Sequence, residues 1–126
     1  MFKKVDCVRL PVMGLDKAVA FYRDRLGHEL VWRRKGDSAG LRMNGSDTEI
    51  VLVEGRIKSE ANLLVESVDI AVHDFLEAGG SIVKPAFDIP IERCAVIEDP
   101  WGNQLVILDL SKGLLKTDSD RSVLQP

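Results

Sequence analysis

The stretch Asp99-Pro100-Trp101-Gly102-Asn103, followed by the apolar run Leu105 to Leu110, predicts a tight turn that leads into a buried strand. Pro100 presets φ for the second position of a turn, and Gly102 can adopt a positive φ that a residue with a Cβ resists. The run after it is short, rich in branched residues and bounded by polar ones, which is typical of a buried strand. The end of the chain is therefore expected to supply a central strand.

A second informative stretch lies at the start of the chain, where a strand and a helix are expected. Residues 5–12 alternate: Val8, Leu10 and Val12 share one face, while Cys7, Arg9 and Pro11 share the other. This alternation indicates a strand with one covered face. Helical spacing then runs from Asp16 to Leu26, and Gly27 is a typical helix terminator.

The order of elements predicts an α+β protein built from two tandem β-α-β-β-β modules whose curved sheets enclose a cleft. Strand patterns at 28–34, 40–43 and 49–53 follow the first helix. After a polar linker come a strand at 62–65, a helix at 68–78, and strands at 81–84, 93–98 and 104–110, with a loop at 85–90. Asp69 follows Asp16 by 53 positions, and Gly80 follows Gly27 by the same 53, which indicates an internal repeat. We expect a single domain at 1–110, with modules at 1–55 and 60–110, and a surface tail at 111–126.

Two of these segments together resemble a known family. The segment Ala20-Phe21-Tyr22 with Leu26-Gly27, paired with the distant Asp99-Pro100-Trp101-Gly102-Asn103, resembles the vicinal oxygen chelate superfamily over roughly residues 1 to 110. That superfamily groups glyoxalase I, bleomycin resistance proteins and extradiol dioxygenases. The resemblance implies paired modules that commonly assemble as homodimers. For the enzymes of the superfamily it also implies a divalent metal held by His and Glu side chains on four strands.

Carried onto this chain, the implied metal positions hold an incomplete set of ligands. They are Cys7 on the first strand, Glu60 on the matching strand of the second module, Val106 on the last strand, and Glu49 on the fourth strand. A register slip of two residues would replace Glu49 by Val51. Val106 has no donor atom, and a Cys-Glu-Glu set without imidazole is an unusual mixture of ligands. We therefore expect no metal and no cofactor, and no catalytic residue is assigned.

Alternation along the strands predicts which side chains face the cleft. Together with Trp32, which could stack on a planar ligand, the expected ligand-binding residues are Cys7, Arg9, Trp32, Glu49, Val51, Glu60, Asn62, Val106 and Leu108. An apolar surface with a few convergent polar groups is typical of a small-molecule pocket. The alternative is that Arg9 forms a structural ion pair with Glu49 or Glu60 and that Cys7 is a buried small hydrophobe. Trp101 is expected to pack locally.

Composition narrows the class of function. A net charge of −3 over 126 residues does not favour a nucleic-acid partner, and no apolar run approaches the length of a membrane span. Cys7 and Cys94 make no disulfide framework, and the first residues lack the apolar core of a secretory signal, so a cytoplasmic protein is expected.

Three functions remain open. The first is a metal-free binding protein of the bleomycin-resistance type, which would sequester a small aromatic or cationic compound. The second is a divalent-metal-dependent lyase, isomerase or dioxygenase acting on a vicinal dioxygen substrate. An interaction module whose cleft is filled by its own side chains is a third reading.

Overall fold

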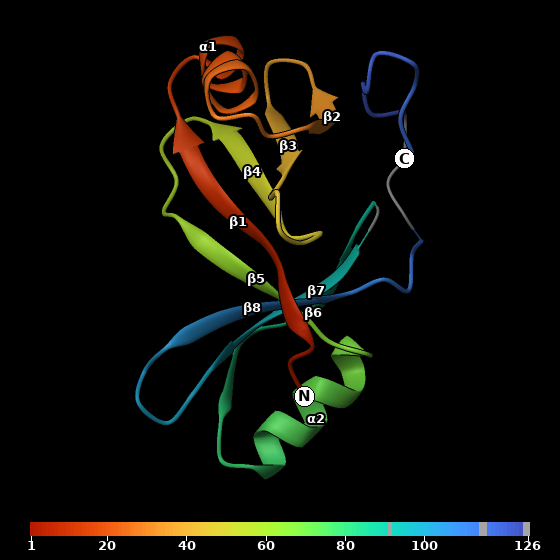
Figure 1. Ribbon diagram of the computed structural model, residues 1–126. Coiled ribbons are helices and arrows are strands. Elements are labelled where there is room, and N and C mark those ends of the chain that lie inside the picture. Colours follow the sequence, from red (N-terminus) through yellow and green to blue (C-terminus); the bar gives the residue numbers. More distant parts are fainter. Residues whose placement is uncertain (91, 114–115, 125–126) are drawn as a thin grey trace. The chain divides into compact units, whose positions relative to one another are not determined.

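The chain divides into two compact units in the computed structural model, which describes residues 1–90, 92–113 and 116–124 (Figure 1). The N-terminal unit comprises residues 6–60 together with 116–124. The C-terminal unit comprises residues 61–90 and 92–113 together with the first five residues of the chain. Among the described residues, each unit carries one helical segment and four strands.

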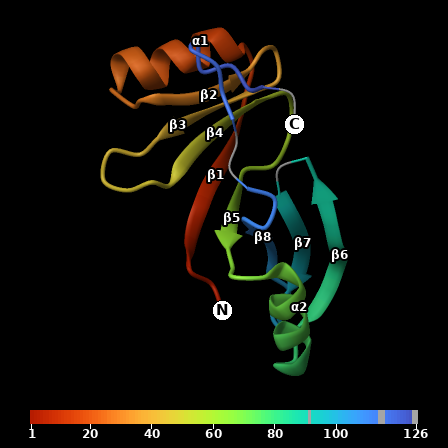
Figure 2. The ribbon, with the colours of Figure 1, turned by 90° about the vertical axis from the view of Figure 1, so that its right-hand side faces the viewer.

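The N-terminal unit follows the order strand, helix, strand, strand, strand. Its elements are β1 (Lys4–Val12), α1 (Leu15–Ala20), the π-helical turn η1 (Phe21–Arg25), β2 (Leu30–Arg34), β3 (Ser38–Arg42) and β4 (Glu49–Glu54). The strands lie in the order β2-β3-β4-β1, with β1 parallel to β4 and the other pairs antiparallel. Figure 2 shows α1 lying across this sheet. Leu15 and Val19 of α1 pack against Leu41 and Leu52, which are fully buried.

The C-terminal unit repeats this plan. Its elements are β5 (Glu60–Leu64, whose first residue, Glu60, belongs to the N-terminal unit), α2 (Val68–Glu77), β6 (Ser81–Ile89), β7 (Glu92–Glu98) and β8 (Gln104–Asp109). The strands lie in the order β5-β8-β7-β6, again with the first strand parallel to the last and the other pairs antiparallel. Val68 and Ala71 of α2 pack against Ile97 and Ile107. The predicted α+β class and the two β-α-β-β-β modules are thus confirmed.

Most strand ends differ from the sequence-based expectation by one or two residues, and two elements differ by more. The expected loop at 85–90 is wrong, because β6 continues to Ile89 with irregular register around Lys84. Pro85 is tolerated there because, in the part of the chain that the structure describes, β6 has β7 as its one neighbouring strand and so needs no hydrogen bond on its outer side. The helix expected to run regularly to Leu26 is regular only to Ala20. It then widens into η1, in which the Leu26 N–H donates to the Phe21 carbonyl.

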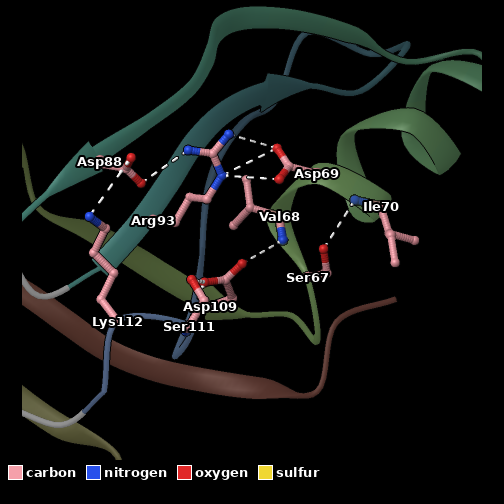
Figure 3. Close-up of polar contacts among 9 residues, drawn as sticks. All are labelled: Ser67, Val68, Asp69, Ile70, Asp88, Arg93, Asp109, Ser111 and Lys112. Carbon is pink, nitrogen blue, oxygen red and sulfur yellow. Dashed lines mark hydrogen bonds and ion pairs between the residues drawn. The ribbon is translucent and has the colours of Figure 1, made fainter.

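A carboxylate at the end of a strand caps each helix. Glu54, the last residue of β4, accepts hydrogen bonds from the backbone N–H groups of Gly14 and Leu15 at 2.9–3.1 Å. Asp109, the last residue of β8, accepts from the Val68 N–H at 2.8 Å, as Figure 3 shows. Unpaired N–H groups and the helix dipole make the first turn of a helix a favourable place for a negative charge.

The C-terminal segment pairs with the edge of the N-terminal unit. The Arg33 N–H of β2 donates to the Arg121 carbonyl at 2.7 Å, and the Val123 N–H donates to the Arg33 carbonyl at 2.8 Å. The side chain of Asp118 accepts from the N–H groups of Asp120 and Ser122, which holds the segment in a turn. The part of the tail that the structure describes beyond residue 115 thus belongs with the first module.

Candidate functional site

The face of the N-terminal unit that lies away from α1 brings together most of the residues predicted to bind a ligand. Register partners place Trp32, Gly40, Val51 and Arg9 in one row across β2, β3, β4 and β1. Glu49 and Cys7 are register partners two residues earlier on β4 and β1. Since Ile50 and Leu52 point to the α1 side, their alternating neighbours point to the opposite face. We call this surface the row face.

Trp32 and Glu49 form a short hydrogen bond on the row face. The indole Nε1–H of Trp32 donates to Oε1 of Glu49 at 2.6 Å. Gly40 makes this contact possible, since a Cβ there would lie 2.1 Å from Trp32 Nε1 and 2.7 Å from Glu49 Oε1. The sequence places a tryptophan and a glycine on neighbouring predicted strands, but their pairing depends on the strand register, which the sequence alone does not give.

Arg9 and Glu60 form an ion pair at the other end of the row. Arg9 Nη1 lies 3.2 Å from Glu60 Oε1, and about a third of each side chain remains exposed (35% and 31%). The structural ion pair considered from the sequence is therefore formed, with Glu60 as the partner. Because both side chains are partly exposed, water screens the attraction between their charges. The ion pair therefore adds little to the stability of the fold, but it orients both side chains.

The floor of the row face is apolar and closely packed. Val51 is 8% exposed and Cys7 is 7% exposed. Cys7 is buried, as the alternative reading from the sequence required. A buried valine between a tryptophan–carboxylate pair and a guanidinium–carboxylate pair gives an apolar patch with polar groups at its two ends.

The C-terminal unit carries a comparable face away from α2. Asn62 of β5 and Val106 of β8 are register partners, and Leu64 pairs with Leu108 in the same way. Cys94 of β7 is the register partner of Leu108 and is buried, a neighbour that the sequence analysis did not select. The Oδ1 atom of Asn62 is buried and has no hydrogen-bond partner among the residues that the structure describes. An unpaired buried carbonyl oxygen costs on the order of 1–3 kcal/mol.

The residues at the positions implied for a metal do not fit a metal centre. Only Cys7 and Glu49 are direct register neighbours, Glu60 is engaged by Arg9, and Val106 has no donor atom. Within the described residues, no three His, Cys, Asp or Glu side chains gather as a metal-binding group. The two histidines have other neighbours: His28 Nδ1 lies 3.1 Å from the Arg42 carbonyl oxygen, and His73 lies on α2 near Glu77.

The expectation for Trp101 was wrong. It was expected to pack locally in its turn, but 83% of the residue is exposed. The turn is held instead by Asp99, whose Oδ1 accepts from the N–H groups of Trp101 and Asn103. These hydrogen bonds, with the Asn103 side chain as the strongest contributor, lower the pKa of Asp99. The indole therefore has no part in fixing the turn.

Comparison with known proteins assigns the chain to a family. The sequence model of the Glyoxalase/Bleomycin resistance protein/Dioxygenase superfamily matches residues 4–107, and the chain belongs to this superfamily. No curated protein matches the sequence significantly. In the described residues, no helix is long and apolar enough to cross a membrane.

Solved structures with the same fold include two methylmalonyl-CoA epimerases. The Mycobacterium tuberculosis epimerase is similar with 21% identity and a TM-score of 0.73, covering 87% of this chain and 89% of its own. A variant of the Streptomyces coelicolor epimerase, in complex with 2-nitronate-propionyl-CoA, has 17% identity and a TM-score of 0.68, covering 88% and 99%. A hypothetical protein from Bacillus halodurans has 15% identity and a TM-score of 0.70, covering 90% and 98%. At these identities the likeness concerns the fold.

Proposed function

We propose that this protein binds a small molecule without a metal, and that the row face is its binding surface. The proposed ligand contacts there are Arg9, Trp32 and Val51, with Cys7 beneath and the carboxylates Glu49 and Glu60 at the ends. We propose the same role, separately, for the face of the C-terminal unit that carries Asn62, Val106 and Leu108. The expected ligand is a small aromatic or cationic compound.

One observation carries this proposal: donors from the chain itself already occupy both carboxylates of the row face. The Trp32 indole holds Glu49 at 2.6 Å and the Arg9 guanidinium holds Glu60 at 3.2 Å. A metal would have to displace a charge-assisted hydrogen bond at each carboxylate, and it would still lack a ligand at Val106. An aromatic ring supported by the buried floor of Val51 would instead leave both contacts in place.

The test is the elemental metal content of protein purified without a chelator, followed by a thermal-shift screen of small aromatic and cationic compounds. We expect no stoichiometric transition metal and a raised melting temperature with at least one compound class. The matched control is a Glu49→Gln, Glu60→Gln double variant. Near-stoichiometric metal that disappears in this variant would refute the proposal.

The second candidate is a divalent-metal-dependent lyase, isomerase or dioxygenase that acts on a vicinal dioxygen substrate. The observation in its favour is that Cys7 and Glu49 are register partners on neighbouring strands. Since two structures of the same fold are named methylmalonyl-CoA epimerases, methylmalonyl-CoA is a suitable first substrate to assay with added Co²⁺. Turnover that requires the metal and is lost in the double variant would establish this alternative.

We also propose that the protein is a cytoplasmic homodimer. Members of the superfamily commonly assemble as homodimers, which supports the dimer. Both cysteines are free thiols, which supports a reducing compartment such as the cytoplasm. Light scattering of the purified protein tests the assembly, and a monomeric mass at micromolar concentration would refute it.

A further inference from the structure

We propose that Asn44 is a site of spontaneous covalent modification, at which the asparagine is converted to aspartate and isoaspartate through a cyclic imide. Asn44 and Gly45 lie in the turn that joins β3 to β4, the yellow loop in Figure 2. This chemistry needs an asparagine that water can reach, a following residue without a side chain, and a backbone N–H that is available to react. The turn provides all three.

The two reacting groups of this turn are accessible. Asn44 and Gly45 are both exposed, and the Met43 N–H donates to the Thr48 carbonyl at 3.0 Å, which closes the turn around them. Within the part of the chain that the structure describes, neither the Asn44 side chain nor the Gly45 N–H forms a hydrogen bond. Apart from its two chain neighbours, nothing lies within 4 Å of the position that a Cβ would take on Gly45. This side of the turn is therefore open.

The reaction needs water as its co-reactant. The Gly45 nitrogen loses its proton and attacks Cγ of Asn44, so that an N–Cγ bond forms, the Cγ–Nδ2 bond breaks and the amide group leaves as ammonia. Water then opens the five-membered imide. Attack of water at Cγ gives aspartate, whereas attack at the backbone carbonyl gives isoaspartate, in which the chain runs through Cβ and Cγ. Either product adds one negative charge to a formal net charge of −3.

The other two asparagines of the chain lack these features. Asn62 is 9% exposed on β5, and a leucine follows it. Asn103 is exposed, but its Nδ2 donates to Asp99 at 2.8 Å and the residue after it is a glutamine. Asparagine is a thermally labile residue in proteins, and here the surroundings of Asn44 favour the reaction while those of Asn62 and Asn103 oppose it.

The two products affect the fold differently. Aspartate replaces an exposed amide by an exposed carboxylate and leaves the backbone as it was. Isoaspartate inserts one additional backbone atom between Met43 and Thr48, which disturbs the hydrogen bond that closes the turn. We expect the isoaspartyl form to melt about 4 °C below the unmodified protein, the shift that corresponds to the loss of one hydrogen bond in a domain of this size.

The test is peptide mass spectrometry of protein that has been incubated at neutral and at mildly alkaline pH. We expect the peptide with Asn44 to gain the mass difference between an amide and a carboxylic acid, and those with Asn62 and Asn103 to keep their masses. The gain should be faster at the higher pH, because the Gly45 nitrogen must lose its proton. Fragmentation of the product should show isoaspartate beside aspartate.

Gly45→Ala is the matched variant. The φ of Gly45 lies outside the left-handed region and a Cβ there meets no neighbour, so alanine fits without strain. Because its methyl group hinders the attack on Asn44, we expect no measurable mass gain over the period in which the unmodified protein is largely converted. An equal gain in Gly45→Ala, a gain at Asn103 as large as that at Asn44, or a product without isoaspartate would overturn the proposal.

Asn44→Asp separates the effect of the charge from that of the backbone. This variant carries the new carboxylate on an ordinary backbone and should melt like the unmodified protein before incubation. The isoaspartyl fraction, isolated by ion exchange, should melt at a lower temperature than this variant. Equal melting temperatures would overturn the disturbance of the turn by isoaspartate.

Discussion

Cys94 shows how burial decides the chemistry that a side chain can perform. Cys94 is 5% exposed on β7. Burial, followed by the nearby negative charge of Glu92, raises the pKa of the Cys94 thiol to about 12. A thiol with such a pKa is protonated and poorly nucleophilic at neutral pH. Cys94 is therefore a packing residue.

The raised pKa of Cys94 predicts a loss of stability at high pH. In the unfolded chain the thiol releases its proton near its ordinary pKa of 9.0, while in the folded protein it holds the proton to about 12. Between these values the folded state binds more protons, so the free energy of unfolding falls as pH rises, by at most about 1.4 kcal/mol per pH unit. Urea unfolding of the unmodified protein and of Cys94→Ala at pH 8 and pH 10 measures this. Cys94→Ala should lose less stability over the interval, and equal losses would contradict the prediction.

Asp109 is a second residue whose environment fixes its charge state. It is 3% exposed and accepts from Val68 N–H at 2.8 Å, Ser111 N–H at 3.1 Å and Ser111 Oγ–H at 2.6 Å. Burial alone would raise the pKa of this carboxyl, but these hydrogen bonds outweigh burial and lower it. Figure 3 shows Arg93 nearby, bound to Asp69 and Asp88, and its positive charge acts in the same direction.

Replacing Asp109 with asparagine should destabilise the protein by about 1–3 kcal/mol, because a charged acceptor of three hydrogen bonds becomes neutral. The unmodified protein should also lose this contribution in acid. Its carboxyl pKa lies below the ordinary 3.8, so the stabilisation is present above that pH and is lost as pH falls through the folded pKa. Urea unfolding at pH 7 and pH 3 measures both effects. Ser111→Ala, which keeps the charge, should cost less than Asp109→Asn, and the reverse order would count against this account.

Among the elements, α1 is the one that depends most on its cap. It has six residues, and Gly14 before it has φ of 99° and gives no side-chain cap. Helices this short are not stable by themselves, so packing and the Glu54 carboxylate must hold the first turn in place. By contrast, α2 has ten residues and is capped by both Ser67 and Asp109.

Glu54→Ala should therefore destabilise the protein by about 0.5–2 kcal/mol, the range for loss of an N-cap, measured by thermal or urea unfolding. A matched control is Glu77→Ala near the end of α2, where the carboxylate has only a 3.9 Å contact with His73. That change should lie within about 0.5 kcal/mol of the unmodified protein. Equal effects of the two substitutions would show that Glu54 is not acting as a cap.

The sequence predicts the elements well where local pattern and tertiary context agree. Alternation around Arg9 and helical spacing around Val19 are local signals, and the structure follows them. It departs from them at Pro85, where a residue that interrupts most strands is accepted because the strand lies at the edge. A local signal cannot show whether a strand has a neighbour on one side or on both.

The same limit applies to the candidate site. Alternation correctly groups Arg9, Val51 and Glu49 on one face of their strands. The hydrogen bond between Trp32 and Glu49 could not be predicted, because it crosses β3 and requires the gap above Gly40. Asn62 beside Val106 likewise follows from the register of β5 on β8, which the internal repeat alone does not fix.

At the scale of the whole molecule, the C-terminal segment contributes to the unit formed by the start of the chain. Arg33 of β2 exchanges two backbone hydrogen bonds with this segment, at 2.7 and 2.8 Å. Without these bonds, β2 would present an unpaired edge, since β3 is its one other partner among the described residues. Unpaired edges of sheets are a common route to association between chains. The segment thus acts as a cover for the β2 edge.

Removing residues 116–126 should therefore make the protein self-associate. In the truncated chain, the N–H and C=O groups of Arg33 lose their partners and can pair with another copy through β2. Sedimentation velocity over a range of concentrations should show species larger than those of the full-length chain. The matched control is Arg121→Gly, which removes a side chain from a residue with φ of 65° but keeps the carbonyl that accepts from Arg33. It should sediment like the unmodified protein, because glycine adopts this φ readily. If the truncated chain also sediments unchanged, the segment is not needed to cover the edge.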